Sequence, residues 1–528
     1  MDSLLRVVVY QSRLYVTYPA VGEVTSDTDL RGAACAWLVN LKDVSEEEVP
    51  KRQPRAHYRR LRVSRSLEDL AGRVIRGTGT PTHVFAIPAA DDEVTQRHAR
   101  SVIDLCLRVG EAMLATGASA ADVVATVLRI SRSYGIMGMH VDITFTSIVV
   151  SIHRGMEEDP ITVMRVVKLR TTDYTRLQNV YRLIEDIVEV EEPMDVFDAR
   201  EALNEIMKRR RPYRRWVQVS GTAILAAGVA AMYNVSFILV LVAAGSTLLS
   251  QTVSRKMSRW GISEFFTQMA AASLITIIAV FMYWLRSVGI EIPGANHPTV
   301  IVISGIIMLL SGIGVTVAAR DAIDGYYVTA SARGMEVIML TLGLAIGISL
   351  TLGVALRLGL PVTIGTQLGS RIELVPGLIG VTLVGLGFAL SSYVRLRQAP
   401  LFVLVAVAGF AVHALIIPFV EQPGLAPGIA GTVAGIIGYL AYRKFKIPET
   451  AMGMAGIVGL IPGLAVYRAL YTFMDSEYAM TDALPALIVA LATGMGLAAG
   501  TSIGAFIARR AFGLDRAALL ASRRTVRK

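Results

Sequence analysis

The feature that most constrains this chain is a succession of long apolar runs that begins at Trp216 and ends near Arg509. Crossing the hydrocarbon core of a bilayer takes about 20 apolar residues in a helix, because a helix satisfies its own backbone groups where no water is present. Ten runs are long enough to span: 216–233, 235–252, 263–285, 299–319, 335–356, 372–393, 400–418, 426–442, 449–471 and 483–507. The sequence therefore predicts a polytopic α-helical membrane protein with ten transmembrane helices.

The composition supports this fold class. Of the 528 residues, 53% are hydrophobic and 18% are charged, whereas a soluble domain carries roughly 25% charged residues. The formal net charge is +10, but the basic residues flank the apolar runs and do not form a separate basic domain. Nucleic acid is therefore not an expected partner, and membrane lipids are.

The positions of Lys and Arg predict the orientation, because cationic loops stay on the cytoplasmic side of a membrane. The run Lys208–Arg211 precedes the first span, and the other basic inner-loop residues are Arg214, Arg215, Arg255, Lys256, Arg259, Arg320, Arg333, Arg395, Arg397, Arg443, Lys444 and Lys446. The outer loops carry only Arg286, Arg357 and Arg371. We expect a multi-pass protein of the cell inner membrane, with both termini in the cytoplasm and no secretory signal.

Charge and periodicity divide the chain into five segments. We expect a poorly defined cytoplasmic extension with a short hairpin at 7–18, a small cytoplasmic α+β domain, two five-helix membrane repeats and a basic cytoplasmic tail. Within the α+β domain, Ser119 is expected to cap a helix, and strands Val141–Phe145 and Thr162–Val166 are expected to form a hairpin. The five segments are 1–94, 95–212, 213–357, 358–508 and 509–528.

The N-terminal third offers few signs of catalysis. Cys35 and Cys106 are interpreted as reduced thiols. His140, Asp142 and His153 are interpreted as surface residues of a half-buried strand, because no third ligand and no nucleophile motif accompany them. No Walker A sequence is present, so intrinsic ATP hydrolysis is not expected. We predict no metal, no cofactor and no enzymatic activity.

The membrane region contains an apparent internal repeat. Pro298–Gly305 of span four and Pro448–Gly456 of span nine superpose with a shift of about 150 residues, which also places spans one, two, three and five over six, seven, eight and ten. A unit of five spans is odd, so consecutive copies enter the bilayer from opposite sides, as in many secondary transporters. Chance similarity between apolar segments is the alternative.

Glycine and proline interrupt the fourth and ninth spans. In inverted-repeat transporters, interrupted helices expose backbone groups to the substrate near the bilayer midplane. Close helix packing explains small residues at such positions equally well. The candidate substrate-binding or transport residues are Ser311, Gly312, Gly314, Pro462, Gly463 and Arg468.

Ionisable residues at the ends of spans are the other candidates, because burying a charge in a membrane is costly. Asp321, Asp324, Glu336 and Glu264 are candidates for proton coupling, and Arg320 and Arg333 are candidates for ion pairs. The alternative for the group around Asp321 is a solvated cytoplasmic loop. Glu264 and Gln268 of span three, His413 of span seven and Arg468 are interpreted singly as interfacial or packing residues, but together they could bind a zwitterion and carry protons.

Several stretches resemble the threonine/serine exporter family over roughly residues 95 to 510. They are Gly117–Asp122, Val141–Ser147, Ala319–Gly325 with Arg333 and Glu336, and Ile461–Tyr467. The resemblance implies a secondary transporter in the inner membrane that exports small hydroxy amino acids, driven by the proton motive force. Alternating access is the expected mechanism, with one acidic group exchanging a proton as substrate leaves.

Three other functions remain open at this level, and one of them is a passive channel, which could not drive net flux against a concentration gradient. Related two-subunit members look like dicarboxylate exporters, so another small metabolite is an alternative substrate. A membrane-anchored enzyme with a catalytic N-terminal domain is the competing class, although ten spans exceed what anchoring requires. The sequence also leaves open whether the chain forms a homo-oligomer.

Overall fold

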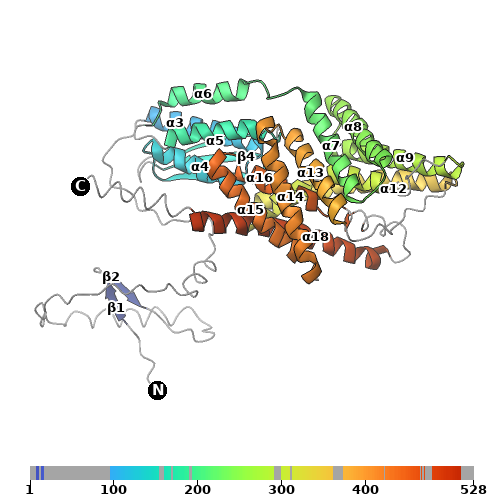
Figure 1. Cartoon of the computed structure of the whole chain (residues 1–528). Helices are drawn as coiled ribbons and strands as arrows, with labels where there is room; N and C mark the ends of the chain where they lie inside the picture. The colour runs from blue at the N-terminus through green and yellow to red at the C-terminus, as the bar shows by residue number, and fades with distance from the viewer. Residues whose placement is uncertain are drawn as a thin grey trace, which may run out of the picture. The chain divides into compact units, whose positions relative to one another are not determined.

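A computed structural model of the chain describes residues 7–10, 13–16, 96–153, 160–167, 171–188, 193–290, 299–309, 312–360, 373–420, 422–463, 465–466, 469 and 479–512 (Figure 1). The chain divides into two units, 1–75 and 76–528. In the first unit, strands β1 (Val7–Tyr10) and β2 (Arg13–Val16) pair antiparallel. This confirms the short hairpin expected there.

Residues 96–208 form a layer of helices and one sheet, which we call the α3–α6 layer. Helices α3 and α4 pack on strands β3, β4 and β5, and Ile148, Val150 and Ile152 are buried at every second position of β4. Ser119 caps α4 by accepting a hydrogen bond from the Asp122 N–H, as expected. The elements are α3 (Gln96–Thr116), α4 (Ala120–Ser133), β3 (Met139–Thr144), β4 (Ser147–Ile152), β5 (Ile161–Val166), α5 (Tyr174–Val188) and α6 (Val196–Lys208).

The expected pairing of two strands in this layer is wrong. The strands around Val141 and Thr162 exist, but β4 lies between them and pairs antiparallel with both. A two-residue turn joins β3 to β4, and Phe145 takes the positive φ of 48° that this turn needs. Glycine and asparagine are the usual signals for such a turn, so the sequence did not reveal it.

The remaining elements are mainly apolar helices. Among the described residues, seven helices are long and apolar enough to cross a membrane: Phe237–Arg259, Glu264–Ser287, Tyr327–Arg357, Leu374–Ser391, Leu396–Phe419, Leu425–Phe445 and Ala483–Phe512. The chain is therefore a multi-pass helical membrane protein. The helices are α7 (Arg215–Met232), α8 (Phe237–Arg259), α9 (Glu264–Ser287), α10 (Thr299–Leu309), α11 (Gly312–Ile323), α12 (Tyr327–Arg357), α13 (Leu374–Ser391), α14 (Ala399–Ile416), α15 (Leu425–Phe445), α16 (Glu449–Ile457) and α18 (Ala479–Phe512), with the 3-10 turns η1 (Leu396–Gln398), η2 (Ile417–Phe419) and η3 (Val458–Leu460).

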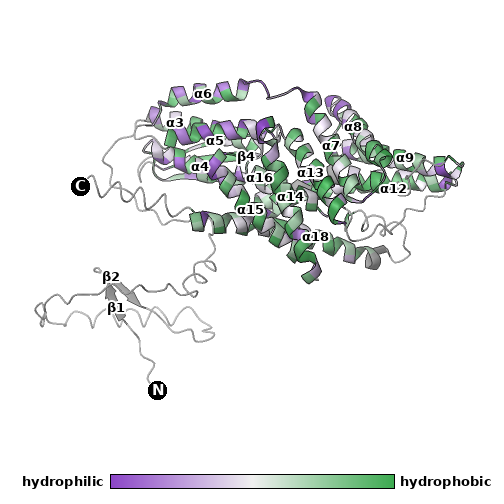
Figure 2. Cartoon of the chain, viewed as in Figure 1, coloured by the Kyte–Doolittle hydropathy of each residue, from purple (hydrophilic) through white to green (hydrophobic). Residues whose placement is uncertain are grey.

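The outer surface of this helical region is apolar. Less than half of each candidate spanning window is buried within the protein, and large apolar side chains such as Leu241, Leu350 and Met495 are exposed. Figure 2 shows green over α7 to α18, whereas α3 to α6 mix purple and green. Exposed apolar bands of this size fit a lipid environment and not water.

Two helix pairs pack with their backbones in close contact. A Cβ atom on Gly228 of α7 would lie 2.6 Å from the Gly380 carbonyl of α13, and one on Gly500 of α18 would clash with the Gly428 carbonyl of α15. Small residues allow such close approach between membrane helices, where dispersion contacts replace the hydrophobic effect. These contacts fix the helices that surround the candidate site.

Candidate functional site

The ninth apolar run is a broken helix. Helix α16 tightens into η3, which ends at Leu460, and the chain becomes helical again at Gly463. Ile461 is extended, and Pro462 has no N–H to continue the helical ladder. The Pro462–Gly463 interruption expected from the sequence is therefore a true break in the helix.

A cavity of about 390 Å³ lies at this break, and we call it the break cavity. This volume is within the range of small-molecule sites. Its walls come from α7, the end of α14, the start of α15, the break itself and α18. The lining residues are Val229, Met232, Tyr233, Phe410, His413, Ile417, Pro423, Pro427, Gly459, Leu460, Ile461, Pro462, Gly463, Ala465, Ala486, Val489 and Thr493.

The polar groups of the break cavity are few. One helix ends and another begins at the break, so partial negative charge from carbonyls and partial positive charge from N–H groups meet there. His413 and Thr493 add polar side chains from α14 and α18, and the Thr493 hydroxyl donates to the Val489 carbonyl at 2.7 Å. None of the residues that line the cavity is Lys, Arg, Asp or Glu.

The described part of the fourth apolar run contains two helical stretches, and residues 310 and 311 between them lie outside the described residues. Helix α10 ends at Leu309 and α11 begins at Gly312, and the side-chain amide of Gln268 in α9 donates to the Leu309 carbonyl. Gly314 lies in α11 and does not line the break cavity. Ser311 lies outside the described residues, and the surroundings of Gly312 are not described.

Charged residues gather where the helices meet the α3–α6 layer. Arg333 of α12 donates to the Asp321 carboxylate of α11 at 2.5 Å, and Asp321 is fully buried. The N–H of Ala120, in the first turn of α4, faces the same carboxylate. The positive end of a helix from the α3–α6 layer therefore adds to the charge that holds Asp321.

A second set of pairs surrounds Arg320, which is 7% exposed. Its guanidinium lies 3.8 Å from Asp324 and 3.7 Å from Glu449, the first residue of α16. Arg509, near the end of α18, lies 3.2 Å from the other oxygen of Glu449. We call Arg320, Asp321, Asp324, Arg333, Glu449 and Arg509 the ion-pair cluster.

Several buried polar atoms of the ion-pair cluster lack a hydrogen-bond partner. The Arg320 Nε, one oxygen of Asp321 and one oxygen of Glu449 are buried without a hydrogen-bond partner. Burial raises the pKa of Asp324 above its usual value, although Arg320 lowers it in part. A buried polar group without a partner raises the free energy of the folded state. A change of protonation or of conformation in the ion-pair cluster can therefore lower this energy.

The structure separates the predicted site residues into distinct places. Pro462 and Gly463 line the break cavity together with His413, whereas the ion-pair cluster lies at the far end of α16, on the order of 15–20 Å away along the helix axis. Glu264 and Glu336 are exposed and belong to neither place. Arg468 lies outside the described residues.

Two members of the ion-pair cluster were not predicted from the sequence. Glu449 follows Pro448 at the start of span nine, and Arg509 ends span ten. Charged residues are common at the ends of membrane helices, and the sequence does not show that Glu449 lies next to Arg320 and Arg509. An acidic residue at the start of the broken helix was the available signal.

The α3–α6 layer is hydrogen-bonded to the ends of the membrane helices. In α12, the Thr329 hydroxyl donates to the Ile143 carbonyl at 2.6 Å and accepts from the Phe145 N–H at 3.2 Å. In α5, the Gln178 amide donates to the Phe445 carbonyl at 3.0 Å. Lys446, which follows α15, pairs with Glu185 of α5 at 2.6 Å. The layer thus contacts helices from both halves of the membrane region.

The residues of the α3–α6 layer that were considered for chemistry do not form a metal centre. The rings of His140 and His153 lie 6.1 Å apart, and no group of three or more His, Cys, Asp or Glu in the described ranges could hold a metal ion. Burial raises the pKa of the Cys106 thiol to about 12, so this thiol is a poor nucleophile. Cys35 lies outside the described residues.

Comparison with known proteins gives a uniform result. Residues 104–355 match the family described as "Putative threonine/serine exporter", and residues 377–507 match "Threonine/Serine exporter, ThrE". A "Probable threonine/serine exporter" of Mycobacterium tuberculosis is 32% identical over 78% of this chain and 77% of its own length. A "Threonine/serine exporter" of Corynebacterium glutamicum is 30% identical over 84% of this chain and 90% of its own length. No solved structure matches the chain.

Proposed function

The chain belongs to the threonine/serine exporter family, and from this premise we propose that it exports threonine, serine or a similar small hydroxy amino acid across the cell inner membrane. The family is one of transporters and not of enzymes. The observation that carries the proposal is the break cavity, where a helix interrupted at Pro462–Gly463 meets helices of both halves of the membrane region.

The chemistry of the break cavity fits a zwitterion. An α-amino acid presents one ammonium and one carboxylate, and the two helix ends at the break offer the opposite partial charges that these groups require. The hydroxyl of Thr493 and the imidazole of His413 are suitable partners for a substrate hydroxyl. A dicarboxylate carries two negative charges, and no Lys or Arg is among the lining residues to neutralise them.

The proposed mechanism is alternating access by two five-helix repeats, 213–357 and 358–508. Corresponding contacts in the two halves support this repeat: α7 packs on α8 as α13 packs on α14, and α9 packs on α12 as α15 packs on α18. The run that corresponds to the broken helix α16 contains α10 and α11 in the first half, with residues 310 and 311 outside the described residues. Inverted repeats of this kind rock about a fixed central site.

The ion-pair cluster is proposed to close the cytoplasmic end of this pathway. Arg320 belongs to the first repeat and Glu449 to the second, so their separation of 3.7 Å bridges the two moving parts. Breaking the cluster would allow substrate to enter from the cytoplasm. The α3–α6 layer, which corresponds to the cytoplasmic domain 95–212, would follow this movement because it is bonded to both repeats.

The proton motive force is the proposed source of energy. Among the four acidic candidates, Asp321 and Asp324 lie in the ion-pair cluster, and Glu264 and Glu336 lie outside it. Asp324 is the better proton carrier, because Asp321 is held by Arg333 and α4. Both termini are proposed to lie in the cytoplasm, with ten spans between them.

Filling the break cavity tests the substrate site. Ala486 of α18 lines the cavity, and its neighbour Leu487 does not line it and is largely exposed. Ala486→Phe should lower export of threonine and serine at least tenfold, while Leu487→Phe should leave it unchanged at equal amounts in the membrane. Equal export by the two variants would remove the break cavity as the site.

Substrate identity is tested by counterflow in membrane vesicles that contain the protein. Counterflow of labelled threonine should be inhibited by serine and not by succinate. Uptake of succinate without uptake of threonine would favour a dicarboxylate exporter instead.

A further inference from the structure

A second cavity, of about 210 Å³, lies where the α3–α6 layer meets the helical region. It is distinct from the break cavity, and we call it the arginine pocket. Three separate parts of the chain form it: α5, the end of α6 with the segment that joins it to α7, and the loop between α13 and α14. Its lining residues are Thr175, Arg176, Asn179, Ile206, Arg209, Arg210, Arg211, Pro212 and Arg395.

The arginine pocket holds an excess of positive charge. Five of its nine lining residues are arginines. Two of these arginines have a carboxylate partner: Asp173 lies 3.6 Å from Arg176 and 3.8 Å from Arg211. Within the described part of the chain, no ion pair is found for the other three arginines of the pocket.

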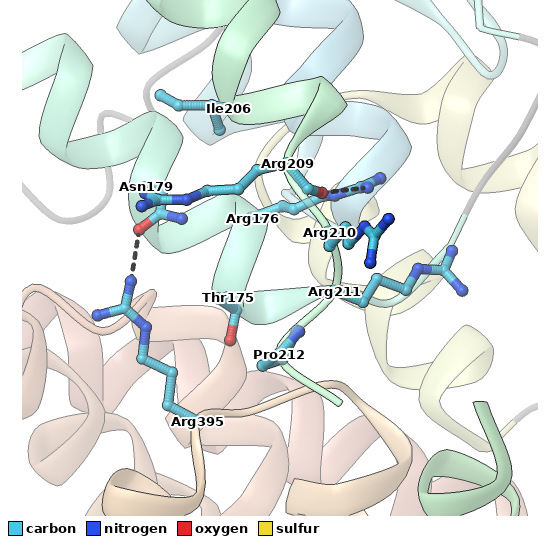
Figure 3. Close-up of a pocket in the computed structure, with 9 residues that line it drawn as sticks. All are labelled: Thr175, Arg176, Asn179, Ile206, Arg209, Arg210, Arg211, Pro212 and Arg395. Atoms are coloured by element: carbon cyan, nitrogen blue, oxygen red, sulfur yellow. Dashed lines mark hydrogen bonds between the residues drawn. The ribbon is translucent and has the colours of Figure 1, made fainter. Parts of the chain in front are cut away.

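The arginine side chains of the pocket have more N–H donors than their hydrogen bonds within the protein use. Figure 3 shows Arg395 reaching from the α13–α14 loop to Asn179 of α5, whose side-chain oxygen accepts its hydrogen bond at 2.9 Å. Arg176 donates to the Arg209 carbonyl at 3.1 Å, which positions the segment between α6 and α7. A guanidinium has five N–H donors, so most of these donors stay available.

The charges of the pocket also repel one another. Burial lowers the pKa of Arg395, and repulsion from Arg182 and Arg209 lowers it further. Retaining basic loops in the cytoplasm requires only that arginines flank a span. That requirement does not explain why Arg176 of α5 and Arg395 of the α13–α14 loop, some 200 residues apart in the sequence, line the same pocket.

We propose that the arginine pocket binds the phosphate group of an anionic ligand at the cytoplasmic surface of the membrane. Guanidinium groups match phosphate oxygens in paired hydrogen bonds, which makes arginine the preferred residue for such sites. Two sources supply this chemistry: the headgroup of an anionic phospholipid and a free phosphate anion. Trp216 and Leu396, which lie close in sequence to Pro212 and Arg395 of the pocket, are 64% and 61% exposed, and exposed apolar side chains beside a basic segment favour the lipid source.

A bound phosphate would connect parts that move separately in the proposed transport cycle. It would join α5 of the α3–α6 layer to the entry of α7 and to the α13–α14 loop. The binding claim itself does not depend on the transported substrate. Its failure and the failure of the proposed function are therefore distinguishable.

The test uses the purified full chain in lipid nanodiscs and measures the midpoint of thermal unfolding together with the lipid retained in native mass spectra. One arm compares phosphatidylcholine with a mixture containing phosphatidylglycerol. The other adds inorganic phosphate to phosphatidylcholine discs, with sodium chloride as the control of equal ionic strength. A rise in the midpoint in the lipid arm identifies a headgroup, and a rise with phosphate identifies a free anion.

Two double variants make the test specific. Arg209→Gln/Arg210→Gln removes two pocket charges, while Arg214→Gln/Arg215→Gln removes two charges that lie close in sequence, at the start of α7, and do not line the pocket. The pocket variant should bind about tenfold more weakly or worse, and the control should bind like the wild type. If the pocket variant does not fold, Arg395→Gln takes its place. No rise in either arm, or equal losses in the pocket and control variants, would overturn the proposal.

Discussion

The guanidinium of Arg320 in α11 lies 3.7 Å from the carboxylate of Glu449 at the start of α16. These residues belong to different halves of the membrane region, and both side chains are largely buried. The same carboxylate also meets Arg509 of α18 at 3.2 Å. One acidic side chain therefore joins three helix ends beside the α3–α6 layer.

Removing the charge of Glu449 should weaken the ion-pair cluster, which we propose closes the cytoplasmic end of the pathway. We expect Glu449→Gln to destabilise the purified protein by about 1–3 kcal/mol, because it leaves Arg320 and Arg509 with fewer buried partners. Thermal unfolding of the protein in nanodiscs measures this. The matched control is Glu264→Gln, which changes an exposed glutamate at the start of α9. Equal stability of the two variants would contradict the role given to Glu449.

Thr329 should anchor the α3–α6 layer to α12. Thr329→Val keeps the shape of the side chain but removes the bonds to Ile143 and Phe145. We expect a cost of about 1–3 kcal/mol and faster hydrogen exchange in β3 and β4. The exposed Ser331 bonds within its own helix, so Ser331→Ala should change neither quantity. Unchanged exchange in Thr329→Val would show that this contact does not hold the layer.

Two alanine substitutions, at Gly228 and Gly245, should have clearly different effects on stability. A Cβ on Gly228 would meet the α13 backbone at 2.6 and 2.7 Å, whereas one on Gly245 of α8 would meet nothing within 4 Å. Gly228→Ala should destabilise the protein by about 1–3 kcal/mol through overpacking. Gly245→Ala should be neutral or stabilising by up to about 1 kcal/mol, because alanine favours a helix. Thermal unfolding of both variants checks the packing of α7 on α13.

Asp324 should make transport depend on pH. Because burial raises its pKa, protonation favours the arrangement in which Asp324 is buried in the ion-pair cluster. The stability of that arrangement is fully present below the ordinary aspartate pKa and is lost as pH rises through the raised pKa. Acidification of the cytoplasmic side should therefore keep this end closed and slow the entry of substrate.

The role of Asp324 is measured by the rate of export as a function of cytoplasmic pH. Asp324→Asn should flatten the profile, and Glu336→Gln, at an exposed position of α12, should keep it. A flattened profile in Glu336→Gln alone would move the proton site to α12.

The sequence predicted most of what depends on local patterns. In the described part of the chain, seven helices that coincide with predicted runs are long and apolar enough to cross a membrane, because a long apolar run has few alternatives there. The other three of the ten predicted spans stay a prediction. The Pro462–Gly463 break was predicted for a similar reason, since proline cannot continue the hydrogen-bond ladder. The turn at Phe145 was missed, because its positive φ of 48° is imposed by the packing around it and not by a glycine.

Contacts between distant parts of the chain were predicted less well. The proximity of Arg320 to Asp324 follows from helical spacing, but the approach of Glu449 and Arg509 depends on how α11, α16 and α18 pack. The contact of Asp321 with the first turn of α4 depends on how the α3–α6 layer docks. Periodicity carries no information about which helix ends meet, so these partners required the structure.

Export itself is the most direct test of the account. Cells that lack amino-acid exporters would be loaded with dipeptides containing threonine and serine, and extracellular threonine and serine would be followed with and without this chain, with a protonophore in parallel. The account predicts that the chain accelerates export of both amino acids and that the protonophore abolishes the gain. No gain in export, with the protein present in the membrane, would contradict it.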